Sequence, residues 1–153
     1  MAQDTSDLAA GIRSGIEAMP FNRLLGIRIK SMQGGRAQGV LEERADLANH
    51  VGTVHVGAQY ALIEAAGGAA VSSALLDLLD SAVPLEVGAE VAYRRPARGT
   101  VVAEAAVAEG DAERVRQELE AQGSSRLQVA VTLTDAQGAM AMDATLRWTV
   151  KKR

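Results

Sequence analysis

Residues 49–70, which read NHVGTVHVGAQYALIEAAGGAA, decide the fold of this chain. A loop-like start is followed, from about residue 55, by small apolar residues at most positions, and this composition predicts a long, buried helix. Glu64 is the only acidic residue in the stretch. Burying a carboxylate without a partner costs on the order of several kcal/mol, so this acid has either a structural partner or a function.

Two adjacent glycines follow Glu64 in the same helix, which we expect to extend to about residue 80. Gly67 and Gly68 each weaken a helix by about 1 kcal/mol relative to alanine. Small side chains also allow a helix to lie close inside a curved sheet. The glycines therefore predict close packing of the helix against another element.

The remaining sequence alternates apolar and polar residues in six segments, which is typical of half-buried strands. The dipeptide at residues 34–35, Gly-Gly, marks a hairpin turn, and short turns favour antiparallel pairing. In the third segment we expect one face to carry Val87, Ala89, Val91 and Tyr93. The expected strands are residues 24–33, 36–45, 84–96, 100–109, 126–135 and 140–150.

Two further helices are expected outside the sheet. Residues 1–20 form an N-terminal helix that Pro20 stops, and we treat residues 21–153 as a single domain. Residues 111–122 have the charges and apolar spacing of a short amphipathic helix ended by Gly123, although exposed hairpins have a similar composition. One long apolar helix beside an antiparallel sheet predicts the α+β class.

The composition argues against several classes of function. The chain has no cysteine, which excludes disulfides and cysteine nucleophiles and makes a cytoplasmic location the default. Its net charge of -3 and few aromatic residues argue against a nucleic-acid surface, and no apolar stretch of about 18 residues predicts a membrane span. His55 and Glu64 are nine residues apart rather than four, so no metal site is expected.

The spacing of polar residues around the start of the long helix resembles a known family. Asn49 is followed six residues later by His55, then by Gly57, and nine residues after the histidine by Glu64. This pattern resembles the acyl-CoA thioesterases of the hotdog superfamily, including the phenylacetyl-CoA type. Those enzymes typically have Asn or Gln, five intervening residues, His-Gly-Gly and an acid on the helix. The segment VAYRRPARG, residues 91–99, is similar to the superfamily's strand that ends in an Arg-Pro-Ala turn.

The resemblance covers the chain from about residue 21 to residue 150 and implies the hotdog fold, a long central helix wrapped by an antiparallel sheet. It also implies hydrolysis of an acyl-CoA whose acyl group is small, medium-chain or aromatic. Glu64 is then the base or nucleophile, and the amides of Val56 and Gly57 stabilise the oxyanion. Asn49 orients water or the carbonyl group, and His55 positions the turn. Val56 stands where the first glycine of His-Gly-Gly is usual.

The expected substrate contacts lie on both sides of these residues. Tyr60 and Gly68 share the helix with Glu64, and Gly68 stands where some of these enzymes have a helper Ser or Thr. Arg94, Arg95 and Arg98 can meet the phosphates of coenzyme A. Coenzyme A is part of the substrate, and we expect no separate cofactor.

Helix geometry predicts that two chains share each site. Val56 and Glu64 are eight residues apart, which is about 12 Å along a helix axis, too far for both to act on one carbonyl group. A second copy running antiparallel brings Glu64 of one chain to the helix start of the other. We therefore expect a homodimer, or a tetramer of two such dimers.

Simpler interpretations remain open for each residue. Glu64 can be a structural acid that bonds to a partner helix, His55 a helix cap, Asn49 a turn residue, and the arginines a solvated strand end. Two other functions fit the same fold. A non-catalytic protein that binds acyl-CoA or an acyl carrier is favoured by Val56, and a hydratase or dehydratase is less favoured because it needs an acid nearer to the histidine.

Overall fold

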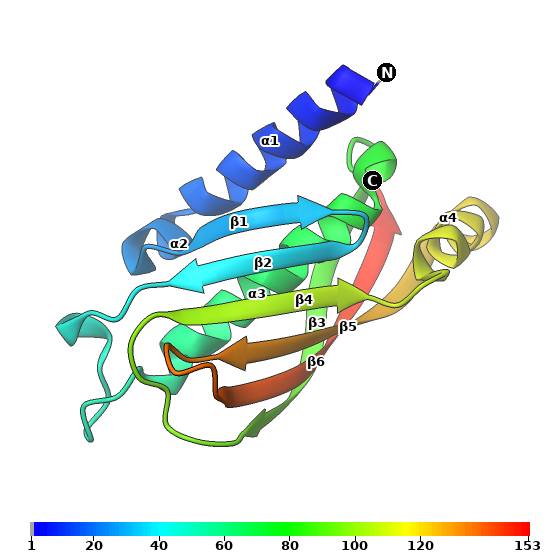
Figure 1. Ribbon diagram of the computed structural model, residues 1–153. Coiled ribbons are helices and arrows are strands. Elements are labelled where there is room, and N and C mark those ends of the chain that lie inside the picture. Colours follow the sequence, from blue (N-terminus) through cyan, green and yellow to red (C-terminus); the bar gives the residue numbers. More distant parts are fainter. Residues whose placement is uncertain (1) are drawn as a thin grey trace.

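The computed structural model describes residues 2–153, and it contains four α-helices and six strands (Figure 1). The helices are α1 (Ala2–Ala18), α2 (Pro20–Leu25), α3 (Val56–Ala74) and α4 (Asp111–Gln122). The strands are β1 (Arg28–Gln33), β2 (Arg36–Leu41), β3 (Ala82–Tyr93), β4 (Val101–Val107), β5 (Ser124–Thr134) and β6 (Met140–Lys152). Two short 3₁₀ turns, η1 (Ala45–Leu47) and η2 (Leu76–Leu78), precede and follow α3.

The six strands form one sheet that curves around α3 (Figure 1). Their order is β1-β2-β4-β5-β6-β3, and every neighbouring pair is antiparallel. Strands β1 and β3 are therefore the two edges. A long helix enclosed by an antiparallel sheet, with an additional N-terminal helix, confirms the α+β hotdog fold expected from the sequence.

The glycines of α3 allow the sheet to approach the helix. A Cβ atom on Gly67 would lie 2.6 Å from Cδ1 of Leu146, and one on Gly68 would lie 3.3 Å from Cη2 of Trp148. The first distance is shorter than any ordinary carbon–carbon contact, so β6 packs where a side chain would otherwise be. The apolar core on this face includes Leu62 and Ile63, neither of which is exposed.

The N-terminal region differs from the expected helix followed by a strand. Pro20 stops α1 as expected, but it also begins α2, because proline is favoured at the first position of a helix. Leu24 and Leu25, expected in a strand, lie in this second helix, which ends at Gly26 with a φ of 75°. The first strand consequently begins at Arg28.

Helix α1 is fixed to the edge of the sheet rather than separate from it. Ile16 is buried, and Glu17 accepts a hydrogen bond of 2.8 Å from the backbone amide of Ile29. The Asn22 side chain donates to the Ile16 carbonyl at 2.9 Å, which ties α2 to α1. These contacts place the end of the N-terminal helix beside α3.

A bulge in β3 interrupts the expected alternation of that strand. The pairing with β6 shifts between Glu86 and Gly88, so Val87 lies outside the regular alternation and is 61% exposed. The prediction that Val87 shares a face with Ala89, Val91 and Tyr93 is therefore wrong for Val87, while the other three do share one face. An isolated glycine within a strand is typical of such a bulge. Glu86 instead pairs with Trp148 and faces the helix side of the sheet.

Of the two remaining helix predictions, the one for residues 111–122 is confirmed and the one for the end of the long helix is wrong. Residues 111–122 do form a helix, with Val115 and Leu119 buried against the sheet and Gly123 ending it at a φ of 75°. The long helix α3 is shorter than expected, since it ends at Ala74 and is followed by η2. None of the described helices has the length and apolar character required to cross a membrane.

Candidate active site

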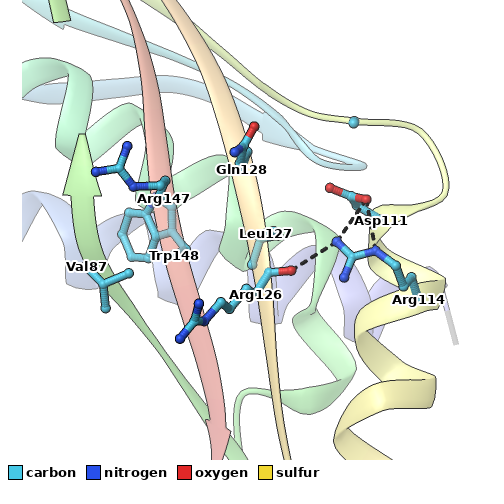
Figure 2. Close-up of a pocket in the computed structure, with 9 residues that line it drawn as sticks. Val87, Asp111, Arg114, Arg126, Leu127, Gln128, Arg147 and Trp148 are labelled. Carbon is cyan, nitrogen blue, oxygen red and sulfur yellow. Dashed lines mark hydrogen bonds and ion pairs between the residues drawn. The ribbon is translucent and has the colours of Figure 1, made fainter. Parts of the chain in front are cut away.

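One hollow in the described structure, beside α4, contains no unpaired carboxylate. It encloses about 750 Å³ between α4 and the strands β5, β6 and β3 (Figure 2). Its charged side chains are Asp111 and the arginines Arg114, Arg126 and Arg147. Asp111 is the only acid that lines it, and Arg114 binds this carboxylate at 3.0 Å. Because Arg114 engages the one carboxylate that lines this hollow, the hollow offers no unpaired carboxylate.

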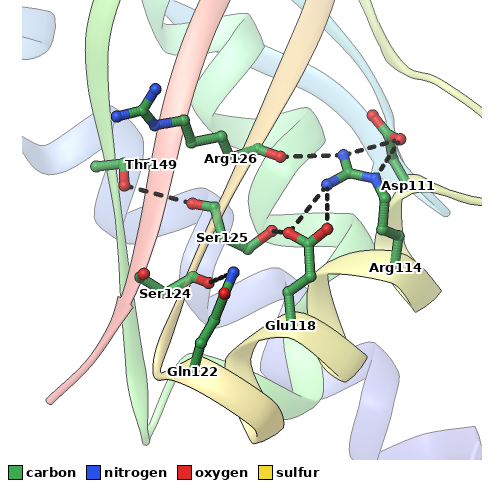
Figure 3. Close-up of polar contacts among 8 residues, drawn as sticks. All are labelled: Asp111, Arg114, Glu118, Gln122, Ser124, Ser125, Arg126 and Thr149. Carbon is green, nitrogen blue, oxygen red and sulfur yellow. Dashed lines mark hydrogen bonds and ion pairs between the residues drawn. The ribbon is translucent and has the colours of Figure 1, made fainter.

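The acid in that hollow belongs to a network on α4, formed by Asp111, Arg114, Glu118 and Ser125 (Figure 3). Arg114 binds Glu118 at 3.2 Å, and the Ser125 hydroxyl donates to Glu118 at 2.6 Å. The Ser125 hydroxyl, together with Arg114, lowers the pKa of Glu118 below its ordinary value. Each carboxylate of this α4 network thus has a donor, and the network joins α4 to β5.

A second hollow, of about 230 Å³, contains Glu64. It lies between the N-terminal helices, α3, β3 and β6. The residues that line it are Ile16, Met19, Asn22, Glu64, Ala65, Gly68, Ser72, Pro84, Leu85, Glu86 and Trp148. We refer to it as the Glu64 hollow.

One stripe of α3 faces this hollow. Tyr60, Glu64, Gly68 and Ser72 follow one another at four-residue intervals, a spacing that places side chains on the same side of a helix. All four are half-buried, whereas the neighbouring Ile63 is fully enclosed. The lone acid of the apolar helix is therefore directed to a hollow and not into the core.

Glu64 is an unpaired carboxyl group within the described part of the chain, with neither a hydrogen bond nor an ion pair. Burial raises the pKa of Glu64, and the nearby charge of Glu86 raises it further. A half-buried carboxylate without a partner is available to accept a proton or to attack an electrophile. The two carboxylates, Glu64 and Glu86, are called the acidic pair below.

Glu86 is held in place by a tyrosine. The Tyr60 hydroxyl donates a hydrogen bond to Oε1 of Glu86, across the interface between α3 and β3. Burial, and then the hydrogen bond to Glu86 and its charge, raise the pKa of Tyr60, so the phenol remains protonated and continues to donate. Sequence reasoning missed Glu86, because strict alternation placed Val87, and not Glu86, on one face with Ala89 and Val91. Gly88 within the strand was the only signal of the bulge.

The start of α3 is capped by His55. Its Nδ1 accepts a hydrogen bond of 2.8 Å from the Gly57 amide, and its own amide donates to the Leu47 carbonyl at 2.8 Å. The Gly57 amide, one of the two expected oxyanion donors, therefore has an internal partner in this arrangement. Val56 precedes it on the exposed surface of the same turn.

Asn49 organises the loop before α3. Its Oδ1 accepts from the amides of Val51, at 3.1 Å, and Thr53, at 3.0 Å, and its Nδ2 donates to the Thr53 hydroxyl at 2.8 Å. The amide of Val54 then donates to the Ala97 carbonyl at 3.0 Å. This bond joins the loop to the Arg-Pro-Ala turn, so the turn lies beside the start of α3.

The three arginines of that turn have different surroundings. Arg94 makes a two-pronged ion pair with Asp143, at 3.1 and 3.2 Å. Arg95 and Arg98 are exposed, and within the described residues their side chains have no hydrogen bond or ion pair. Two unpaired cations therefore lie close to the start of α3.

The predicted site residues thus form two groups in a single chain. Glu64 and Gly68 line the hollow, with Tyr60 beside them on the same stripe of α3. Asn49, His55, Val56, Gly57 and the arginines gather at the start of α3, and none of them lines the Glu64 hollow. In the part of the chain that is described, no group of three or more His, Cys, Asp or Glu side chains is arranged to hold a metal ion.

Comparisons with known proteins identify the family and the fold of this chain. The sequence pattern of the family described as "Domain of unknown function (DUF4442)" matches residues 13–150. The "Putative esterase VNG_1336C" of Halobacterium salinarum is 35% identical over 107 residues, which cover 68% of this chain and 70% of that protein.

Solved structures show the same fold. PA5026 of Pseudomonas aeruginosa, described as a protein of unknown function and "Probable Thioesterase", has a TM-score of 0.83 at 23% identity, covering 97% of this chain and 96% of that one. A mutant of the thioesterase PA1618 from the same organism has a TM-score of 0.74 at 17% identity, covering 97% of this chain and 94% of that one. At these identities the likeness establishes the hotdog fold alone.

Proposed function

This chain belongs to the DUF4442 family, and from that premise we propose that it hydrolyses acyl-CoA thioesters. The observation that carries the proposal is Glu64, an unpaired, half-buried carboxyl group that faces a hollow. The names of the Halobacterium relative and of the two Pseudomonas structures support the same reaction class.

In the proposed reaction Glu64 acts on a water molecule or on the thioester itself. As a base, it takes a proton from water while the water oxygen attacks the carbonyl carbon. The C–S bond then breaks, and the thiol leaves with the proton, so that water and a thioester give a carboxylic acid and a thiol. As a nucleophile, Glu64 forms an anhydride that water opens afterwards. Neither route requires a cofactor.

The oxyanion donors in this scheme come from the start of α3 in a second copy of the chain. Within one chain, Val56 and Glu64 are separated by about 12 Å of helix. Strand β3 has a free edge of 12 residues, on which Leu85 and Val87 are 50% and 61% exposed. A long, apolar edge strand favours pairing with another chain. We therefore propose a homodimer, alone or as half of a tetramer, in the cytoplasm.

Residues near each end of the site have suitable chemistry for the two ends of the substrate. We propose that Arg95 and Arg98, the exposed cations near the start of α3, bind the phosphates of coenzyme A. Ile16, Met19 and Trp148 offer apolar surface to an acyl group in the Glu64 hollow. A hollow of about 230 Å³ suits a short, medium-chain or single-ring acyl group.

A second candidate, a non-catalytic binding protein for acyl-CoA or an acyl carrier, is favoured by the start of α3. Val56 replaces the usual glycine, and the Gly57 amide already donates to His55. In that case the hollow would bind a thioester without turning it over. A substrate oxygen would have to displace the His55 bond, or use the Val56 amide alone, for hydrolysis to occur.

Release of free thiol from a panel of acyl-CoA esters tests both candidates. We expect the wild-type protein to hydrolyse at least one ester and Glu64→Gln to lose about 10² or more in rate, as for a positioned acid–base group. Glu90→Gln, which removes an exposed acid from the outer face of β3, is the matched control and should keep full activity. Equal activity of wild type and Glu64→Gln would remove Glu64 from the mechanism. Thermal stabilisation by the esters without turnover would favour the binding protein.

A further inference from the structure

The charged side chains that this chain contributes to the Glu64 hollow are all acidic. Its other polar lining residues, Asn22 and Ser72, are neutral. The arginines of the adjoining strands lie on the other face of the sheet. Arg147 covers Gly88, where an added Cβ would be 2.4 Å from its Nη2, and Arg94 is bound to Asp143. No cation of the described chain therefore neutralises the acids in the hollow.

Glu86 is a fixed charge and not a mobile surface acid. Its Oε1 accepts from the Tyr60 hydroxyl, and it pairs in register with the buried Trp148 at the bulge of β3. It is half-buried and lines the same hollow as Glu64. The Tyr60 hydrogen bond holds the carboxylate toward the hollow, at a position that the backbone of β3 sets.

We propose that Glu86, held by Tyr60, selects the acyl group by charge, so that the hollow accepts neutral or cationic acyl chains and rejects those that carry a second carboxylate. The inference rests on the proposed thioester hydrolysis and names a substrate class for it. Like charges a few ångström apart in a partly buried site repel strongly, while a cation would be attracted. Selectivity is commonly achieved through such repulsion of the wrong ligand.

Three coenzyme A esters of similar length test the proposal. Pentanoyl-CoA is neutral, glutaryl-CoA carries an added carboxylate, and 4-(trimethylammonio)butanoyl-CoA carries a cation. For the wild-type protein we expect kcat/KM to be lowest for glutaryl-CoA. Glu86→Gln should reduce the preference for pentanoyl-CoA over glutaryl-CoA by about tenfold or more, since one of the two repelling charges is removed. High salt should also reduce the wild-type preference for pentanoyl-CoA over glutaryl-CoA, because salt screens the repulsion.

Two further variants separate charge selection from a structural effect. Tyr60→Phe keeps the charge of Glu86 but frees its side chain, and we expect a smaller change of the same sign. Glu90→Gln removes an equal charge from the outer face of the same strand and should leave the ratio unchanged. A merely structural role of Glu86 would lower kcat/KM for the three esters alike.

The outcomes distinguish this inference from the proposed function. If Glu86→Gln hydrolyses the esters with the wild-type ratio, charge selection by Glu86 is wrong while thioester hydrolysis stands. If the wild-type protein hydrolyses none of the esters, the ratio of their dissociation constants, measured by thermal shift for both proteins, tests the same selection. An unchanged ratio there would overturn the inference as well. If Glu86→Gln fails to fold, Tyr60→Phe tests the proposal instead. An unchanged preference for pentanoyl-CoA over glutaryl-CoA in that variant counts against charge selection by Glu86.

Discussion

The α4 network and the acidic pair place carboxylates in opposite surroundings. On α4, Asp111 and Glu118 lie near the surface and both are bound by Arg114 (Figure 3). Between α3 and β3, Glu64 has no partner, and the partner of Glu86 is a neutral phenol. Donors lower the pKa of Glu118, whereas burial and a like charge raise the pKa of Glu64.

This difference separates structural acids from candidate functional ones. A carboxylate that is paired by arginine near the surface contributes little to stability, and the arginine neutralises its charge. A half-buried carboxylate near a like charge costs stability, and a protein keeps such a group where the group has a use. The larger hollow, beside α4, is therefore the weaker candidate site, although it has about three times the volume of the Glu64 hollow.

The largest expected effect on stability comes from the apolar side of α4. Leu119 is 3% exposed, and Leu119→Ala should lower the free energy of unfolding by about 2–4 kcal/mol, the usual cost of removing a buried leucine side chain. Urea unfolding measures this loss. Thioester hydrolysis at a temperature where the variant is folded should stay at the wild-type level. A folded variant with reduced hydrolysis would mean that α4 belongs to the active site. The distinction between a structural α4 network and a functional acidic pair would then be wrong.

A smaller effect of opposite sign is expected from Glu64. Because the folded protein raises the pKa of Glu64, ionisation opposes folding, and its cost appears as pH rises above the ordinary glutamate value of 4.5. Glu64→Gln should therefore match the wild type in stability near pH 4 and exceed it by about 1 kcal/mol at neutral pH. Urea unfolding at several pH values measures the difference. Glu90→Gln, at an exposed site, should show no such pH dependence; a less stable Glu64→Gln at neutral pH would instead identify a structural partner for Glu64.

The sequence predicted one half of the acidic pair and missed the other for a physical reason. Glu64 stands out because charge is rare in an apolar helix, and Gly67 and Gly68 predicted close packing that β6 indeed provides. Glu86 could not be placed, because one extra residue at a bulge changes the alternation, so that Glu86, before the bulge, shares a face with Ala89 and Val91 after it.

The walls of the Glu64 hollow were also beyond sequence reasoning. Ile16 lies in the expected N-terminal helix and Met19 at the break that follows it, but periodicity shows which residues are apolar and not which element they contact. The position of that helix depends on particular bonds, such as Glu17 to the Ile29 amide. Contacts between distant segments of this kind have no local signature.

The smallest effect should come from an ion pair that joins α4 to the end of α3. Arg116 binds Asp77 at 2.7 Å and also donates to the Ala74 carbonyl at 3.0 Å. Arg116→Ala should cost about 0.5 kcal/mol, because exposed pairs gain little over their hydrated, separated ions, and added salt should reduce that cost. A double-mutant cycle with Asp77→Asn isolates the charge pair from the carbonyl bond. A coupling free energy of 2 kcal/mol or more would show that an ion pair near the surface stabilises this protein substantially. An arginine partner would then no longer distinguish an acid of little energetic effect from a functional one.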